Sequence, residues 1–193
     1  MPARATTPEG LLQRERILRA ALELFPVHGF RGTSLDRVAA AVGISRQGVL
    51  HYFPSKTHLL LGVLELRDEQ TAASAESRSG PLLQSLLGVV AENQRDSDLT
   101  RLYTVLSAES VAPEHTGHAH FQARYRMVRE VMTEAVLEAR EAGDVREDLD
   151  PGYIAVLIAA VMDGLQQQFL LEPEAVDMVA VFKTFLQLLE PRS

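Results

Sequence analysis

Apolar residues recur along most of the chain at intervals of three and four positions, the spacing that places side chains on one face of an α-helix. The pattern is clear after residue 34, where the residues at positions i, i+3, i+4 and i+7 from Leu35 are all apolar. No strict alternation of apolar and polar residues runs longer than a few positions, and we find no internal repeat or low-complexity tract. The sequence therefore predicts an all-α protein.

Residues that typically begin and end helices divide this pattern into nine predicted helices. Thr7 and Pro8 begin the first, which ends at the sequence HGF, and we expect Pro26 to bend or remove its last turn because proline has no amide hydrogen. Gly43 ends the second helix, and Ser45 caps a third that stops before Pro54. Ser55 caps the fourth helix. After a break at Gly80-Pro81, helices are predicted at residues 82–95, 98–111, 119–142, 151–170 and 174–189.

Length and composition limit the class of protein. A chain of 193 residues with 46% hydrophobic residues is ample for a packed core. The first ten residues lack the apolar core of a signal peptide, and the longest near-continuous apolar run, 153–162, is half the roughly 20 residues that a membrane span needs. The absence of cysteine excludes disulfides and thiolate metal sites. We expect a soluble, cytoplasmic protein without a membrane partner.

Charge is distributed unevenly along the chain. Residues 1–58, which we call the head, hold eight basic and four acidic side chains, whereas the remaining residues, the body, hold 11 basic and 22 acidic ones. A positive head on a negative body suits a head that contacts phosphate groups. Ordinary scatter of surface charge would produce the same numbers, so the charge alone does not show whether the head binds phosphate groups.

Residues 35–49 have the spacing of a helix-turn-helix motif. Counted from Leu35, the fifth residue is Ala39, the ninth is Gly43 and the fifteenth is Val49. These are the small residue, the left-handed turn residue and the apolar plug that the motif requires where its two helices cross. An αα-hairpin without a role in nucleic-acid binding has a similar pattern and remains the alternative.

The residues around this motif resemble a known family. The sequence RERILRAALELF, followed by GF and by TSLDRVAAAVGISRQGVLHYFPSKTHLL, is similar to the DNA-binding domain of the TetR (tetracycline-repressor) family, and the match covers residues 12 to about 62. The segment VMDGLQQQFLLEPEAVDM resembles a carboxyl-terminal segment of many members. The resemblance implies a helix-turn-helix domain at residues 12–72 and a ligand-binding and dimerisation domain at residues 73–193.

The resemblance also assigns DNA contacts by position. It makes Arg46, Gln47 and Gly48 the residues nearest to base edges in the major groove, and the chemistry agrees, because Arg pairs with guanine, Gln pairs with adenine and Gly lets the backbone approach. The positions implied to contact phosphates are Thr33, Ser34, His51, Tyr52 and Lys56.

Leu50 departs from the family, since many members have a DNA-contacting tyrosine there. Either that contact is lost, or Leu50 packs against a thymine methyl group or the domain core. Of the two adjacent aromatic residues, we expect Phe53 to be buried and Tyr52 to be exposed.

In the body, the predicted helix at 151–170 is apolar nearly all round over ten residues, and the helix at 174–189 has a broad apolar stripe. They resemble the two helices that form the family's dimer interface, although internal burial in a monomer would explain them too.

A small-molecule pocket is implied between the head and this interface. Aromatic or polar residues interrupt aliphatic faces at its candidate lining positions, although each could also be ordinary core: Tyr103, Phe121, Tyr125, Met162, Gln166 and Phe169. Asp163, Gln166 and Gln167 lie within one helical turn and could read a ligand or form a hydrogen-bonded seam across the dimer.

Metal and catalytic chemistry have little support. His115, His118 and His120 have a spacing that can bind zinc or nickel, but a solvated loop is the better interpretation and we expect no metal. No catalytic triad order, phosphate-binding glycine loop or dinucleotide fingerprint occurs, so we expect neither an enzyme nor a cofactor.

The main hypothesis is a ligand-responsive transcriptional regulator, a repressor, that binds a pseudo-palindromic operator in double-stranded DNA as a homodimer and is released by a small-molecule effector. The alternatives are a helical module whose head docks a protein, and an enzyme that uses a cavity in the body. The effector, the operator sequence and the regulated genes do not follow from the sequence.

Overall fold

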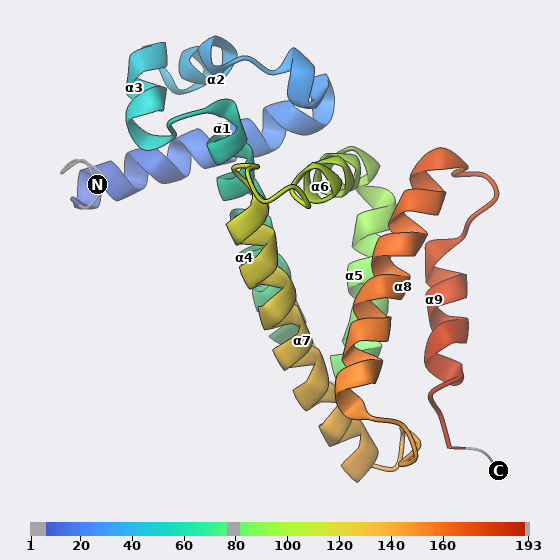
Figure 1. Cartoon of the computed structure of the whole chain (residues 1–193). Coiled ribbons are helices and arrows are strands. Elements are labelled where there is room, and N and C mark those ends of the chain that lie inside the picture. Colours follow the sequence, from blue (N-terminus) through green and yellow to red (C-terminus); the bar gives the residue numbers. More distant parts are fainter. Residues whose placement is uncertain (1–6, 77–81, 192–193) are drawn as a thin grey trace.

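The computed structural model describes residues 7–76 and 82–191, with side chains for 7–69 and 85–191. This part of the chain forms nine α-helices and no strand, as the sequence predicts (Figure 1). The helices are α1 (Pro8–Gly32), α2 (Leu35–Val42), α3 (Arg46–Tyr52), α4 (Lys56–Glu76), α5 (Leu82–Arg95), α6 (Ser97–Glu109), α7 (His118–Glu141), α8 (Pro151–Leu171) and α9 (Met178–Gln187).

Local hydrogen bonds set the helix ends in the head. The side-chain oxygens of Thr7, Ser34 and Ser45 each accept from the backbone amide three residues later and so cap α1, α2 and α3. Gly43 ends α2 in the left-handed conformation, with φ 71°, which a residue without a Cβ adopts at little cost. The predicted helix-turn-helix geometry is therefore present.

One bend and one helix start differ from the prediction by more than two residues. The backbone stays helical around Pro26 and breaks at Gly29, which has φ 67°, so the expected bend lies three residues further on within the sequence HGF. Helix α9 begins at Met178 rather than at residue 174, because the carboxylate of Asp177 accepts from the amides of Val179 and Ala180 and caps the helix there.

The buried apolar side chains form two clusters. The first, the head cluster, joins α1–α4 to α6 and to one residue of α7: its members include Ile17, Phe25, Val38, Val49, Phe53, Leu59, Leu99, Leu102, Leu106 and Phe121. The second, the body cluster, joins α5, α7, α8 and α9: its members include Leu86, Val90, Met132, Val136, Ile154, Ile158, Phe169 and Phe182. In Figure 1, α4 leaves the head and runs down the molecule towards the body. The head is thus packed continuously onto α6.

A close crossing fixes α4 against α1. A Cβ at Gly62 would lie 2.9 Å from Leu18 Cδ2 and 3.1 Å from Phe53 Cε1, both within the head cluster. The first distance is shorter than real Cβ contacts and the second is tighter than most of them, so a larger residue at this position would force Leu18 and Phe53 to move.

Among the described residues, α8 is the one helix whose length and composition would allow it to cross a membrane. One such helix is weak evidence, because a core helix of a soluble protein passes the same test. Helix α8 packs on α7 and α9 and buries Ile154, Ile158 and Phe169 in the body cluster.

Candidate functional site

Helix α3 exposes one polar face and buries the opposite face in the head cluster. Arg46, Gln47 and His51 are exposed, whereas Val49 is fully buried in the head cluster. The Arg46 side chain is 62% exposed, and its Nε lies 4.0 Å from an Asp36 carboxylate oxygen in a loose surface ion pair. The predicted base-reading residues therefore lie together on the open surface of the head.

Gly48 lies on the same helix, and its amide donates to Ser45 Oγ at 3.0 Å. A Cβ there would come within 3.3 Å of Ile44 Cδ1, so glycine also lets α3 pack closely on the turn.

The residues predicted to contact phosphates have different environments. Ser34 is exposed. Lys56 Nζ donates to Phe30 O at 2.7 Å and lies 4.4 Å from the centre of the Phe30 ring. The hydrogen bond uses one of the three N–H donors of the lysine. Thr33 is fully buried and its hydroxyl donates to Leu24 O, so a side-chain contact from Thr33 to a phosphate requires that this hydrogen bond break.

The aromatic pair at the end of α3 matches its prediction in part. Phe53 is 3% exposed and belongs to the head cluster, as expected. Tyr52 is half-buried rather than exposed, because its ring packs against the same cluster and meets the His51 ring edge-on at 5.3 Å. Leu50 also packs against the head cluster, which supports the domain core among its three alternatives.

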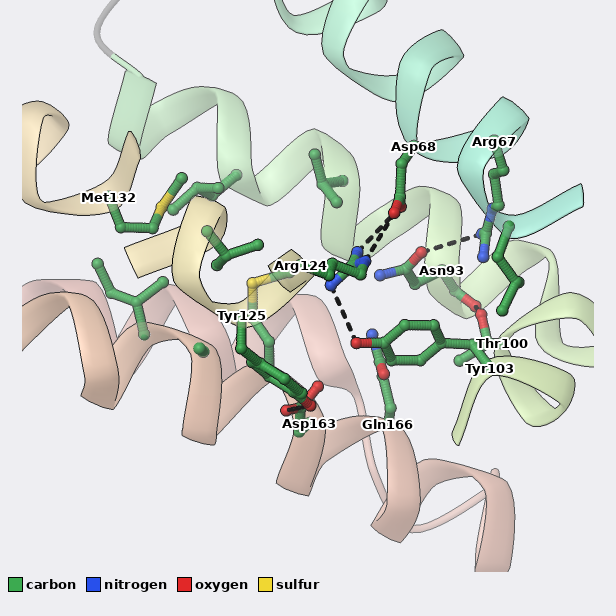
Figure 2. A pocket seen from close by; sticks show the side chains of 17 residues that line it. Arg67, Asp68, Asn93, Thr100, Tyr103, Arg124, Tyr125, Met132, Asp163 and Gln166 are labelled. Carbon is green, nitrogen blue, oxygen red and sulfur yellow. Dashed lines mark hydrogen bonds and ion pairs between the residues drawn. The ribbon is translucent and has the colours of Figure 1, made fainter. Parts of the chain in front are cut away.

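A cavity of about 170 Å³ lies between α4, α5, α6, α7 and α8 (Figure 2). Four of the six predicted lining residues face it: Tyr103, Tyr125, Met162 and Gln166. Phe121 and Phe169 do not line it, because Phe121 packs against the Tyr103 ring in the head cluster and Phe169 lies in the body cluster. The cavity thus lies where the two clusters meet.

Charged residues that the sequence did not single out also line the cavity. Arg124 donates two hydrogen bonds to the Asp68 carboxylate, at 2.6 and 2.9 Å, and a third to the Tyr103 hydroxyl at 3.0 Å. Its guanidinium also lies 4.8 Å from the centre of the Tyr103 ring. One side chain of α7 therefore ties α4 and α6 together, as the dashed lines of Figure 2 show.

Burial and hydrogen bonding shift the pKa values of these groups. Burial alone would lower the pKa of Arg124, but the hydrogen bonds to Asp68, together with the electrostatic effects of Tyr103, Asp68 and Tyr125, outweigh it and raise the value. Burial raises the pKa of Asp163, against the opposite effects of its hydrogen bond with Tyr125 and of the Arg124 charge. Burial also raises the pKa of Tyr125, whose hydroxyl donates to Asp163 Oδ2 at 2.5 Å.

Arg67 is the second arginine of the cavity. Its guanidinium donates to Asn93 Oδ1 at 3.0 Å. Burial lowers its pKa, while the carboxylates of Asp96, Asp68 and Glu92 act in the opposite direction.

A second polar link joins the head to α7. Glu65 of α4 lies 3.2 Å from His120 Nδ1 and 4.0 Å from an Arg14 nitrogen of α1. The hydrogen bond from His120 lowers the pKa of Glu65, although partial burial opposes the shift. Together with the Arg124–Asp68 pair, this link fixes α7 to two successive turns of α4.

The other two histidines of the predicted loop hold the turn between α6 and α7. His115 Nδ1 is 3.0 Å from Ser110 Oγ, and His118 Nδ1 is 3.0 Å from Ser110 O. A Cβ at Gly117 would lie 2.3 Å from Ser110 Oγ, so a side chain at this position would displace the hydroxyl that contacts His115. Among the described residues, no three side chains of the metal-binding types are grouped as a metal site would need.

A more open cleft of about 540 Å³ lies between the end of α1 and α6. Its walls include Phe25, Phe30 and Val105, with Arg31, Arg101 and Glu109 among the charged residues. None of these described lining residues has a buried polar side-chain atom without a hydrogen-bond partner.

Helices α8 and α9 carry apolar side chains that no described residue covers. Tyr153, Leu157 and Leu171 of α8 are 76%, 50% and 75% exposed, and Val181 and Leu188 of α9 are 46% and 68% exposed. Small residues, Ala160 and Gly164, lie between Leu157 and Leu171 at helical spacing, and a Cβ at Gly164 would meet nothing within 4 Å. Such a surface is typical of a contact between subunits.

Comparison with known proteins gives matches over most of the chain. Residues 17–63 match the family model of bacterial regulatory proteins of the tetR family, and residues 81–190 match that of the BetI-type transcriptional repressor carboxyl-terminal domain. The HTH-type transcriptional repressor AcnR of Corynebacterium efficiens is 29% identical over 164 residues, which cover 83% of each chain.

Solved structures share the fold. A TetR-family regulator from Rhodococcus aligns with a TM-score of 0.75 and 21% identity, over 93% of this chain and 98% of that one. The complex of SmeT from Stenotrophomonas maltophilia with triclosan aligns with a TM-score of 0.69 and 24% identity, over 92% of this chain and 89% of that one.

Proposed function

The chain belongs to the TetR family of transcriptional regulators, and from this we propose that it is a repressor that binds a pseudo-palindromic DNA operator as a homodimer and leaves it when a small-molecule effector binds. The observation that carries the proposal is the polar face of α3, on which Arg46, Gln47 and His51 are exposed while Val49 anchors the helix. A helix held in this way can enter the major groove as a rigid unit.

In this proposal Arg46 and Gln47 read base edges. A guanidinium pairs with guanine O6 and N7, and a glutamine amide pairs with adenine. The ion pair of Arg46 with Asp36 is 4.0 Å long and exposed, so exchange for a guanine costs little. Gly48 leaves the backbone of α3 open to the DNA.

Ser34, His51, Tyr52 and Lys56 would position the head on the phosphates. Lys56 has two donors left after its hydrogen bond with Phe30 O. Thr33 is left out of the proposed interface, because its hydroxyl is buried and already donates to Leu24 O.

The dimer would form through the exposed apolar faces of α8 and α9. Two recognition helices can reach successive major grooves, roughly 34 to 36 Å apart, only if two heads are held together. Ala160 and Gly164 would let the α8 helices of two subunits approach closely.

The effector would bind in the cavity between α4 and α8. Its walls belong to both clusters, and Tyr103 stands on α6, which packs onto the head. A ligand that moves Arg124 would act on α4 and α6 at once, because that side chain holds both. An affinity difference of roughly 1–3 kcal/mol between two head spacings would be enough to release DNA.

We propose no catalytic role for the cavity, and we place the regulator in the cytoplasm, where its DNA is. The exposed apolar face of α8 is assigned to the partner subunit rather than to a membrane.

The test is selection of bound fragments from random genomic DNA, followed by fluorescence anisotropy at several salt concentrations. A repressor of this kind selects inverted repeats and binds them with an affinity that falls steeply with salt. Fragments without dyad symmetry, or no binding above the level of bovine serum albumin, would contradict the proposal.

A further inference from the structure

The cavity contains a buried acceptor with no donor. Gln166 is 6% exposed and lines the cavity, and its Oε1 has no hydrogen-bond partner among the described residues. In the part of the chain whose side chains are described, three other buried side-chain atoms lack a partner, on Gln13, His120 and Arg140, but none of these residues lines the cavity. A buried carbonyl oxygen without a donor is unfavourable, so the site suits a ligand that supplies an N–H or O–H group.

A carboxylate stands beside this acceptor. Asp163 lies three residues before Gln166 on α8, which puts both side chains on one face of the helix, with Cβ atoms roughly 5–6 Å apart. Asp163 accepts one hydrogen bond, from Tyr125, and no arginine or lysine nitrogen of the described residues lies within 4.0 Å of it. Figure 2 shows both residues on α8, with Asp163 beneath Tyr125 and Gln166 beneath the Tyr103 hydroxyl.

The two arginines of the cavity are already matched by acidic groups. Arg124 gives two donors to Asp68 and one to Tyr103, and Arg67 lies near Asp68, Glu92 and Asp96. Among the residues that line the cavity, the two carboxylates of Asp68 and Asp163 balance two guanidinium groups, whereas Glu92 and Asp96 act on Arg67 from outside the lining. An anionic effector would have to displace Asp68 from Arg124, whereas a cation would meet the Asp163 carboxylate, which no guanidinium of the described residues pairs with.

Asn93 and Thr100 also line the cavity, and the rest of the wall is mainly apolar. Leu86, Val89, Val128, Met132 and Ile158 line it, and Met132 lies at the opposite end of Figure 2 from Gln166. The cavity therefore offers acceptors at one end and hydrocarbon contact at the other.

We propose that the effector is a small organic cation with N–H donors, a protonated primary or secondary amine that carries an apolar group, and that its nitrogen lies between the Asp163 carboxylate and the Gln166 carbonyl oxygen. The inference rests on the proposed function only in naming the cavity as the effector site. A single ammonium group has enough donors for both oxygens, and its apolar group would lie towards Met132. A quaternary ammonium group has no N–H to give to Gln166.

The experiment measures thermal unfolding and calorimetric binding of the full chain with butylamine and phenethylamine. The comparison compounds keep the shape and change the head group: phenylethanol, phenylpropanoate and trimethylated phenethylamine. We expect an amine to raise the unfolding temperature at millimolar concentration, and the alcohol, the carboxylate and the quaternary ion to bind at least about tenfold more weakly.

Three variants assign the effect to residues. Asp163→Asn and Gln166→Met should each weaken amine binding, the first by at least about tenfold and the second by several-fold. Glu130→Gln removes the same charge from an exposed position of α7 outside the cavity and should leave binding unchanged. The unfolding temperature of each variant without ligand is measured as well, which guards against a loss of binding caused by misfolding alone.

The inference is overturned if phenylpropanoate binds more tightly than the amines, if Asp163→Asn binds amines as wild type does, or if no amine binds at all. DNA binding without ligand is measured in parallel. Intact DNA binding without amine binding would remove this inference and leave the proposed function, whereas amine binding without DNA binding would do the reverse.

Discussion

In the head, the hydrogen bonds that cap α2 and α3 join residues three positions apart. The hydrogen bonds that Arg67, Arg124 and Tyr125 donate in the cavity join residues 21 to 56 positions apart. The head is also held by a tightly packed cluster in which Val38, Val49 and Phe25 have no exposed surface. The cavity, in contrast, is held by polar pairs between helices, such as Arg124 with Asp68 and Tyr125 with Asp163. Local contacts keep a recognition helix rigid, while long-range polar pairs have partners that a ligand can replace.

The largest expected effect would come from separating the two heads. Leu157→Asp puts a charge into the proposed contact between subunits, and we expect it to dissociate the dimer and reduce operator affinity at least about 1000-fold, towards the non-specific level. Sedimentation and fluorescence anisotropy measure the two effects. Leu137→Asp is the matched control, because Leu137 of α7 is 44% exposed against 50% for Leu157. Dissociation by the control alone would move the interface to α7.

Arg46→Ala tests the rigid reading surface. The loss of a bidentate contact to guanine should cost ~1–3 kcal/mol in each half-site and flatten the preference at one base pair. Arg129→Ala removes an equal charge from an exposed position of the body and should leave the base preference intact. The measurement is binding to a set of operators with single base changes. An equal loss on every sequence would show that Arg46 contacts only phosphate.

Asp68→Asn tests the polar pairs of the cavity. It leaves the partly buried Arg124 without its anion, and we expect the free energy of unfolding to fall by about 2 kcal/mol, less than for a fully buried pair because both groups keep some contact with water. The control Asp98→Asn breaks an exposed pair with Arg101 and should cost less than about 0.5 kcal/mol. Similar losses in urea denaturation would remove the contrast between the cavity and the surface.

Gly62→Ala tests the packing of the head. The added methyl group would overlap Leu18 and Phe53, so unfolding should become easier by ~1–2 kcal/mol. Gly164→Ala in α8 meets nothing within 4 Å in the same chain, so in a monomeric Leu157→Asp background it should be neutral or stabilising by up to ~1 kcal/mol. A loss at Gly164 in the dimer, absent from a monomeric Leu157→Asp background, would mean that the partner subunit fills that space.

The smallest expected effect concerns the link between Glu65 and His120. The pKa of Glu65 is lower in the folded protein than its ordinary value of 4.5, so its contribution to stability is complete above that value and is lost as the pH falls through the lowered pKa. Glu65→Gln should therefore cost less than ~1 kcal/mol at neutral pH, and the difference from wild type should shrink in acid. Denaturation at several pH values checks this. A difference that grows in acid would contradict the assignment.

The sequence predicted the head more completely than the cavity, for physical reasons. Ser34, Gly43 and Ser45 act within their own turns, so their roles follow from their neighbours in sequence. Arg124 and Asp68 are 56 positions apart, and a charged residue on a helix is more often solvated than paired in the interior. Phe121 and Phe169 are of a residue type that often lines ligand cavities. Which side of a helix faces the cavity, however, depends on how five helices pack together.

The continuous packing of the head onto α6 limits how this protein can be rebuilt from parts. Leu99, Leu102 and Leu106 of α6 share one core with Ile17 and Phe25 of α1. A chimera that joins residues 1–72 of this chain to the body of another protein would lose this shared apolar core. A DNA-binding domain transferred to another protein would therefore need α6 as well, or a matched set of apolar side chains on the new body. The part of the chain that must be transferred together is larger than the helix-turn-helix.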